Sequence, residues 1–121
     1  MDISLLRRVP LFKVLKDDDL EAIARVTITR SFDKDQVIIL AEEEGDALFI
    51  IASGQVKVSI VTEDGREVIL SLLGEGAVFG ELSLLDGKPR SANVVATEDT
   101  ELYMVRRTDF LQLVYKVPQI A

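Results

Sequence analysis

Residues 17–26 carry hydrophobic positions at the spacing of a helix. In DDDLEAIARV, Leu20, Ile23 and Ala24 fall on one face of a period of 3.6 residues. Three aspartates crowd the first turn, where the helix dipole favours negative charge. The pattern predicts a helix from Asp17 to Val26.

From residue 27 to residue 106 the pattern changes to short β-branched runs, which is typical of strands. SANVVAT (91–97) and ELYMVRR (101–107) are predicted to form a strand pair, and TDFLQLVYK (108–116) a helix capped by Thr108. Turn signals separate the runs at Glu44-Gly45-Asp46, Glu63-Asp64-Gly65 and Gly74-Glu75-Gly76.

GQVKVSIVT (54–62) alternates most clearly. Val56, Val58 and Ile60 fall on one face, and Gln55, Lys57 and Ser59 fall on the other. Asp64-Gly65 suits a tight turn into REVILSLL (66–73), so the sequence predicts a hairpin with one buried face.

Many short antiparallel strands flanked by small helices predict a mainly β fold, a jelly-roll-like antiparallel β-barrel. The chain has 121 residues, of which 48% are hydrophobic, so it is large enough to bury a core. No linker, repeat or low-complexity tract interrupts it. We expect one domain over residues 1–121.

The charge balance argues against direct binding to nucleic acid. Fourteen Lys and Arg against 21 Asp and Glu give a formal net charge of −7, the wrong sign for neutralising DNA phosphates. The acidic runs AEEEGDA (41–47) and KDDDLE (16–21) are interpreted as solvated faces, so no metal site is expected.

The chain contains neither cysteine nor histidine. This excludes disulfides, thiolate nucleophiles, imidazole metal ligands and histidine acid–base catalysis. A metal-dependent barrel enzyme of the cupin type would need histidine and carboxylate ligands on its strands, so we expect no enzyme activity.

Targeting and membrane segments are not expected either. The apolar run ALFIIA (47–52) is far shorter than the roughly 20 residues of a membrane span, and MDISLLRRVP has too short an apolar stretch for a signal peptide. The sequence therefore predicts a cytoplasmic protein without a membrane partner.

The stretch FGELSLLDGKPRSA (79–92) breaks the strand pattern. A single helical turn over 81–85, entered through Gly80, would leave its first backbone N–H groups free to bind an anion. A phosphate is therefore expected against Gly80 to Ser83. Because the turn at 86–89 folds the chain back, Arg90 can reach the same anion, and Ser91 can add a hydroxyl donor.

Glu81 needs a donor, because a carboxylate beside a bound anion would otherwise repel it. A sugar hydroxyl next to the phosphate would supply that donor. The combination of Gly80, Glu81 and Arg90 therefore predicts a sugar phosphate, and hence a nucleotide, as the ligand.

GEGAVFGELSLLDGKPRSANVVA (74–96) resembles the phosphate-binding cassette of cyclic nucleotide-binding domains. The resemblance extends over nearly the whole chain, from the first helices through the glycine-punctuated barrel (Gly45, Gly54, Gly65, Gly76) to the last helix. It is strongest to the sensor half of bacterial regulators of the CRP/FNR class.

The resemblance implies a role for each site residue. The backbone of Gly80, Leu82 and Ser83, together with Arg90 and Ser91, would bind the cyclic phosphate, and Glu81 the ribose hydroxyl. Serine rather than threonine at position 91 favours cAMP as the effector. The resemblance also implies that the base and sugar side of the barrel is lined by Val58, Leu70 and Ser71.

In the resembling regulators a long helix after the barrel dimerises and covers the base, and a DNA-binding domain follows. This chain ends where that helix would begin, so a homodimer and DNA binding are expected only of a longer protein. A start at the barrel without a preceding membrane span favours such a regulator over an ion channel. By itself the chain is expected to be a weak dimer or a monomer that discriminates bases poorly.

Two alternatives stay open. The barrel could be a degenerate scaffold for dimerisation or docking that binds no ligand, or it could be the sensor of an effector that does not bind DNA. Arg90 and Glu81 favour a ligand-binding sensor over the scaffold, because a scaffold has no need of a cation placed for an anion.

Overall fold

The computed structural model describes residues 3–39, 47–80 and 92–116. Within these ranges the helical elements lie at the two ends of the chain and the strands lie between them. The elements are α1 (Ile3–Leu6), the 3-10 helix η1 (Pro10–Phe12), α2 (Asp17–Val26), β1 (Ile28–Phe32), β2 (Val37–Ile39), β3 (Ala47–Ser53), β4 (Val56–Val61), β5 (Glu67–Leu73), β6 (Val78–Phe79), β7 (Asn93–Ala96), β8 (Thr100–Arg106) and α4 (Arg107–Lys116).

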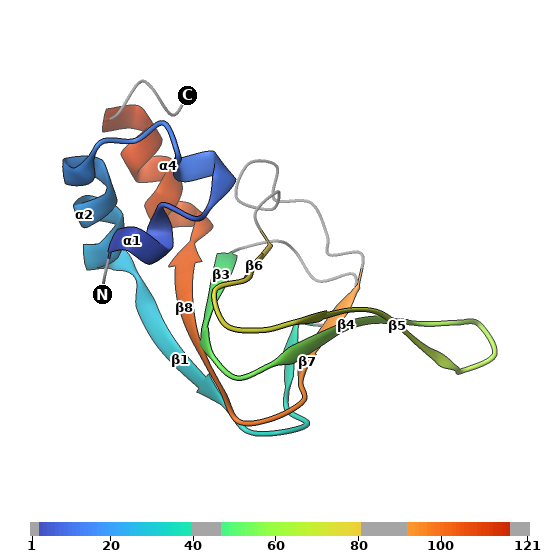
Figure 1. The fold of residues 1–121 in the computed structure, drawn as a ribbon. Helices are drawn as coiled ribbons and strands as arrows, with labels where there is room; N and C mark the ends of the chain where they lie inside the picture. The colour runs from blue at the N-terminus through green and yellow to red at the C-terminus, as the bar shows by residue number, and fades with distance from the viewer. Residues whose placement is uncertain (1–2, 40–46, 81–91, 117–121) are drawn as a thin grey trace.

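The strands form two four-stranded antiparallel sheets, one in the order β1-β8-β3-β6 and the other in the order β2-β7-β4-β5. Helices α1, α2 and α4 gather at one end of the molecule, and the β4–β5 hairpin projects from the opposite end (Figure 1). The predicted antiparallel, jelly-roll-like fold class is confirmed. Among the described strands, the two sheets do not join into one closed barrel.

One predicted strand pair is wrong. β7 pairs with β2 and β4, whereas β8 pairs with β1 and β3 in the other sheet. The short connection between them carries the chain from one sheet to the other, and it is tied to the turn between β3 and β4. The hydroxyls of Thr97 and Thr100 hydrogen-bond the carbonyl oxygen of Gln55 at 3.1 and 3.2 Å.

The two longer helices occur where the sequence predicts them. α2 has the predicted bounds and buries Leu20 and Ile23. α4 begins at Arg107, so Thr108 lies inside the first turn rather than at the N-cap. The predicted acidic residue of that turn, Asp109, accepts a hydrogen bond from Arg106 Nε at 2.9 Å.

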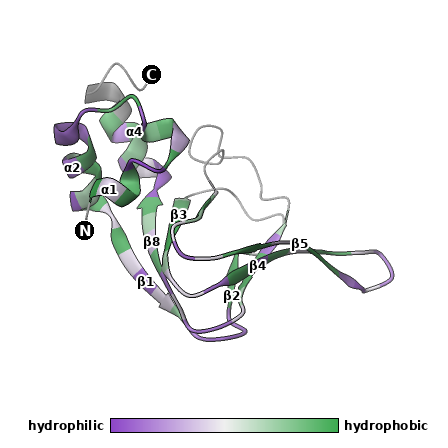
Figure 2. Cartoon of the chain, in the orientation of Figure 1, coloured by the Kyte–Doolittle hydropathy of each residue, from purple (hydrophilic) through white to green (hydrophobic). Residues whose placement is uncertain are grey.

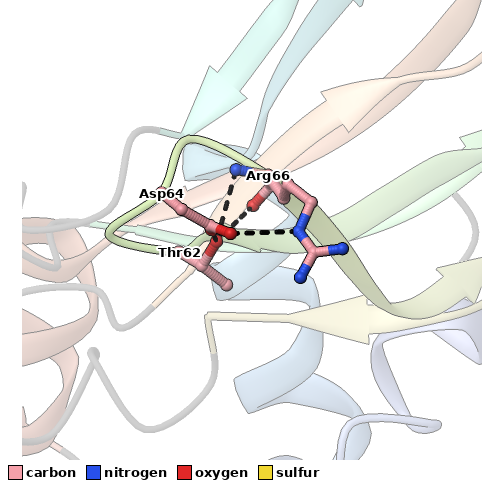
Figure 3. Close-up of polar contacts among 3 residues, drawn as sticks. All are labelled: Thr62, Asp64 and Arg66. Carbon is pink, nitrogen blue, oxygen red and sulfur yellow. Dashed lines mark hydrogen bonds and ion pairs between the residues drawn. The ribbon is translucent and has the colours of Figure 1, made fainter.

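The β4–β5 hairpin also follows the prediction, and polar contacts close its tip (Figure 3). Gly65 has a φ of +84°, a left-handed conformation that glycine adopts without strain, and its N–H donates to the Thr62 carbonyl at 2.9 Å. The Asp64 carboxylate contacts the Thr62 hydroxyl and accepts from Arg66 Nε at 3.1 Å. Local turn chemistry therefore sets the register at this end of the hairpin.

Strand β3 is buried on both faces and separates two hydrophobic clusters. Leu48 and Ile50 face the helices, where they join Phe12 and Phe110, whose rings stack with centroids 5.9 Å apart. The other face of β3 contributes to the cluster between the sheets, which contains Ala47, Phe49, Ile51, Val56, Phe79, Val94 and Leu102. A strand that is buried on both faces has a continuous run of apolar residues in its sequence, and β3 has such a run in ALFIIA.

Candidate functional site

Gly80 directly follows β6, at the start of the segment that the sequence singles out. Its φ is +81°, so an L-residue with a side chain would be strained at this position. β6 pairs with β3 through Phe49↔Phe79 and Ile50↔Val78. The chain therefore enters the candidate site directly after the edge strand β6, which is paired with the buried strand β3.

Packing on both faces of β6 fixes this entry point. The Phe79 ring is buried and stacks on Phe49 with centroids 5.0 Å apart, whereas Val78 packs against the helical cluster. The preceding turn is held to β3, because Gly76 N–H donates to the Ile51 carbonyl at 2.8 Å. Position 80 is therefore set by both hydrophobic clusters.

The preceding turn also makes a contact that the sequence did not predict. Gly76 has a φ of +84°, and the Arg8 guanidinium occupies the space where a side chain at Gly76 would lie. The turn signal Gly74-Glu75-Gly76 was visible in the sequence. The contact with Arg8 could not be predicted from the sequence, because no local pattern relates positions 8 and 76.

Several predicted site residues lie outside the described residues: Glu81, Leu82, Ser83, Arg90 and Ser91. What the structure describes is the chain on either side of them. Gly80 directly follows β6 in one sheet, and residue 92 leads into β7, which begins at Asn93 in the other sheet. The predicted anion-binding segment therefore connects the two sheets.

Val58 and Ser71, two of the three residues expected to line the base and sugar side, are brought together across the β4–β5 hairpin. They are directly opposite each other, and Val94 of β7 lies on the other side of Val58. Val58 is half-buried and packs against the cluster between the sheets, whereas Ser71 is exposed. Val58 thus lies beside the strand that follows Arg90 and Ser91.

Leu70, the third of these residues, occupies a bulge. The register shifts between Val58↔Ser71 and Ser59↔Ile69, so Leu70 has no partner on β4. Leu70 is 56% exposed, like its neighbours Ile69 and Leu72 on the same strand. A ligand-lining role for Leu70 stays a prediction.

A polar cluster braces the same hairpin and was missed in the sequence. Ser59, expected on the polar face, is 1% exposed. Its hydroxyl donates to one Glu67 oxygen at 3.1 Å, and Lys57 Nζ donates to the other at 2.9 Å. The alternation of Lys57 and Ser59 on one face was the available signal for a shared acidic partner.

These donors lower the pKa of Glu67 below its ordinary value of 4.5, with the Lys57 hydrogen bond the largest cause. Because the folded pKa lies below the unfolded one, the carboxylate stabilises the fold fully above about pH 4.5. This contribution is lost as the pH falls through the folded pKa. The pKa of Asp64 is also lowered, chiefly by the Thr62 hydroxyl, and it acts in the same direction.

We therefore expect Glu67→Gln to reduce the loss of stability on acidification. Urea unfolding of the unmodified chain and the variant, at steps from about pH 6 to about pH 3, measures the difference. Glu101→Gln, which changes an exposed glutamate of β8, is the control. Equal acid sensitivity of all three proteins would contradict the bracing role of Glu67.

The described residues contain no group of three or more Asp and Glu side chains arranged to hold a metal ion. In the same part of the chain, no helix has the length and apolar character needed to span a membrane.

Comparison with known proteins points to one family. A family model described as cyclic nucleotide-binding domain matches residues 29–116. The chain is 38% identical over 112 residues to the cyclic AMP receptor protein of Thermus thermophilus, covering 93% of this chain and 52% of that protein. It therefore spans about half the length of that relative.

Two further similarities involve different kinds of protein. A cyclic nucleotide-gated potassium channel of Mesorhizobium japonicum is 37% identical over 118 residues, covering 98% of this chain and 31% of the channel. The crystal structure of the N-terminal domain of a transcriptional regulator from Streptomyces coelicolor superposes with a TM-score of 0.87 at 28% identity, covering 96% of this chain and 81% of that one.

Proposed function

The chain belongs to the cyclic nucleotide-binding domain family, and from that premise we propose that it binds a cyclic nucleotide and acts as a regulatory sensor without catalysing a reaction. The observation that carries the proposal is the family match over residues 29–116, which includes the whole segment from Gly80 to Ser91. The left-handed backbone at Gly80, held by β6 and β3, supports it.

In the proposed complex the cyclic phosphate lies against the backbone of residues 80–83. Arg90 neutralises it with a guanidinium suited to bidentate contact, and Ser91 adds a hydroxyl donor. Glu81 accepts a hydrogen bond from the ribose 2′-hydroxyl. The juxtaposed Val58 and Ser71, with Leu70 at the neighbouring bulge, supply the base and sugar side.

We propose cAMP as the effector, on the basis of Ser91 and the similarity to the Thermus cyclic AMP receptor protein. The proposed output is transcription regulation through a dimer and a DNA-binding domain outside this chain. Similarity to the S. coelicolor regulator domain supports this output. Similarity to the gated channel favours an effector that does not bind DNA as the alternative. A cytoplasmic location stays a prediction from the sequence.

Glu81→Gln tests the proposed orientation of the nucleotide. A hydrogen bond from a hydroxyl to a carboxylate contributes about 1.5–3 kcal/mol, so the unmodified chain should bind cAMP roughly 10- to 100-fold more tightly than 2′-deoxy-cAMP. In Glu81→Gln the ratio of the affinity for cAMP to the affinity for 2′-deoxy-cAMP should fall toward one, mainly because cAMP binds more weakly. Equilibrium binding of both ligands to both proteins measures it.

Glu75→Gln is the matched control, because Glu75 is an exposed glutamate on the turn before β6. It should keep the preference for the ribose form. An equal loss of both ligands in Glu81→Gln would show that Glu81 acts through folding, and absence of binding by the unmodified chain would refute the proposed function itself.

A further inference from the structure

The outer edge of β5 has no strand partner among the described residues, because β5 is the last strand of its sheet. All but one of its seven residues are exposed. Figure 2 shows hydrophobic residues along most of β4 and β5, with hydrophilic residues at the hairpin tip. The exposed apolar side chains of β5 are Val68 at 42%, Ile69 at 53%, Leu70 at 56% and Leu72 at 57%.

The other edge strands of the described sheets lack this combination. β2 has three residues and β6 has two, so neither offers a long edge. β1 carries Thr29, Arg30 and Ser31 as its exposed residues. A long, apolar and unprotected edge is a template for pairing with another strand, and β5 is the described strand that provides one.

We propose that β5 pairs antiparallel with β5 of a second copy of this chain across a two-fold axis. In one register, Val68 lies opposite Leu73 of the second copy and Ile69 opposite Leu72. Residues that lie opposite each other in an antiparallel pair must be on the same face of the sheet. This register meets that condition, because Val68 and Leu73 share one face of the hairpin and Ile69 and Leu72 share the other. The bulge at Leu70 produces this agreement, since it shifts the alternation by one residue.

Charge complementarity at the two strand ends supports a second copy as the occupant. The same register places Arg66 of one copy opposite Glu75 of the other, and two-fold symmetry repeats the pair. Arg66 has an 84% exposed side chain and uses Nε for Asp64, which leaves its terminal nitrogens as donors (Figure 3). Glu75 is exposed and forms no ion pair with another described residue.

The proposed dimer does not depend on nucleotide binding. We expect it to be weak, with a dissociation constant on the order of 100 µM, because one strand pair buries little area. The net charge of −7 on each copy also opposes association. This contact is separate from dimerisation through a long helix beyond the barrel.

Sedimentation equilibrium of the 121-residue chain, from about 10 µM to about 1 mM without nucleotide, tests the proposal. We expect a reversible monomer–dimer equilibrium that Ile69→Lys weakens at least tenfold. Val37→Lys is the matched control, because Val37 is 46% exposed on β2 at the opposite edge of the same sheet. A monomer at every concentration, or equal weakening by both variants, would overturn the proposal.

Charge reversal tests the register. Glu75→Arg should weaken the dimer, because it places two arginines opposite each other twice, and adding Arg66→Glu should restore it. Circular dichroism confirms that each variant is folded. Failure of the double variant to dimerise, with the fold intact, would refute the paired Arg66 and Glu75. Slower amide exchange of residues 67–73 at high concentration is expected, and exchange independent of concentration would contradict pairing through β5.

Discussion

Arg90→Ala is expected to weaken the binding of cyclic nucleotide by roughly 30- to 4000-fold while the chain remains folded. In the proposed complex the guanidinium is the main cation against the phosphate, and truncating one partner of a hydrogen-bonded charge pair that is buried on binding costs on the order of 2–5 kcal/mol. The backbone N–H groups of residues 80–83 would remain but carry no full charge. Calorimetric titration of cAMP into the variant measures the loss.

Arg30→Ala is the control for this variant. Arg30 is an exposed arginine on β1, where its guanidinium lies 5.8 Å from the centre of the Phe32 ring. Its removal changes the net charge equally and should leave affinity unchanged. An Arg90→Ala protein with the unmodified melting temperature and unmodified affinity would show that Arg90 takes no part in ligand binding.

Among the variants proposed for this chain, Gly54→Ala is expected to lower the free energy of unfolding most. Gly54 has a φ of +97°, and a Cβ there would lie 2.6 Å from the Asp99 carbonyl oxygen and 2.7 Å from the Thr100 Cα. It would also collide with the Thr100 hydroxyl. Asp99 lies in the connection between β7 and β8, and Thr100 is the first residue of β8, so the turn at Gly54 would have to move away from the start of β8 to relieve the clash. We expect a loss of roughly 3–5 kcal/mol in the free energy of unfolding, at the upper end for point mutants.

Gly65→Ala separates the two causes of that loss. Gly65 also has a positive φ, +84°, but nothing lies within 4 Å of the position of an added Cβ. It should therefore show backbone strain alone, about 1–2 kcal/mol. Urea unfolding of both variants gives the comparison. Similar losses at the two positions would show that the contact between Gly54 and Thr100 contributes little.

Elements set by local sequence were predictable. The helix of residues 17–26 and the hairpin around Gly65 depend on spacing and turn chemistry within about ten residues. The partners of β7 and β8 were not predictable in this way. Which sheet each strand joins depends on packing against β3 and β4, tens of residues away in the chain, and on the hydrogen bonds of Thr97 and Thr100 to Gln55.

The predicted site roles stay predictions, because Glu81, Leu82, Ser83, Arg90 and Ser91 lie outside the described residues; the comparison is limited to Gly80 and to the β4–β5 hairpin. The sequence predicted that the chain enters the anion-binding turn through Gly80, but it did not predict the positive φ of +81° that the structure shows there. The alternation on β4 placed Val58 inward but put Ser59 on the polar face, because period-2 patterning does not register a neighbouring carboxylate such as Glu67. The bulge at Leu70 was also hidden, since it depends on the pairing of two strands.

Calorimetric titration of cAMP, cGMP and a cyclic dinucleotide into the unmodified chain tests the proposed function most directly. We predict saturable heat for cAMP at one site per chain, a smaller or similar response to cGMP, and a raised melting temperature with each nucleotide that binds. Absence of heat and of any thermal shift with all three ligands, from a folded chain, would contradict a cyclic nucleotide sensor.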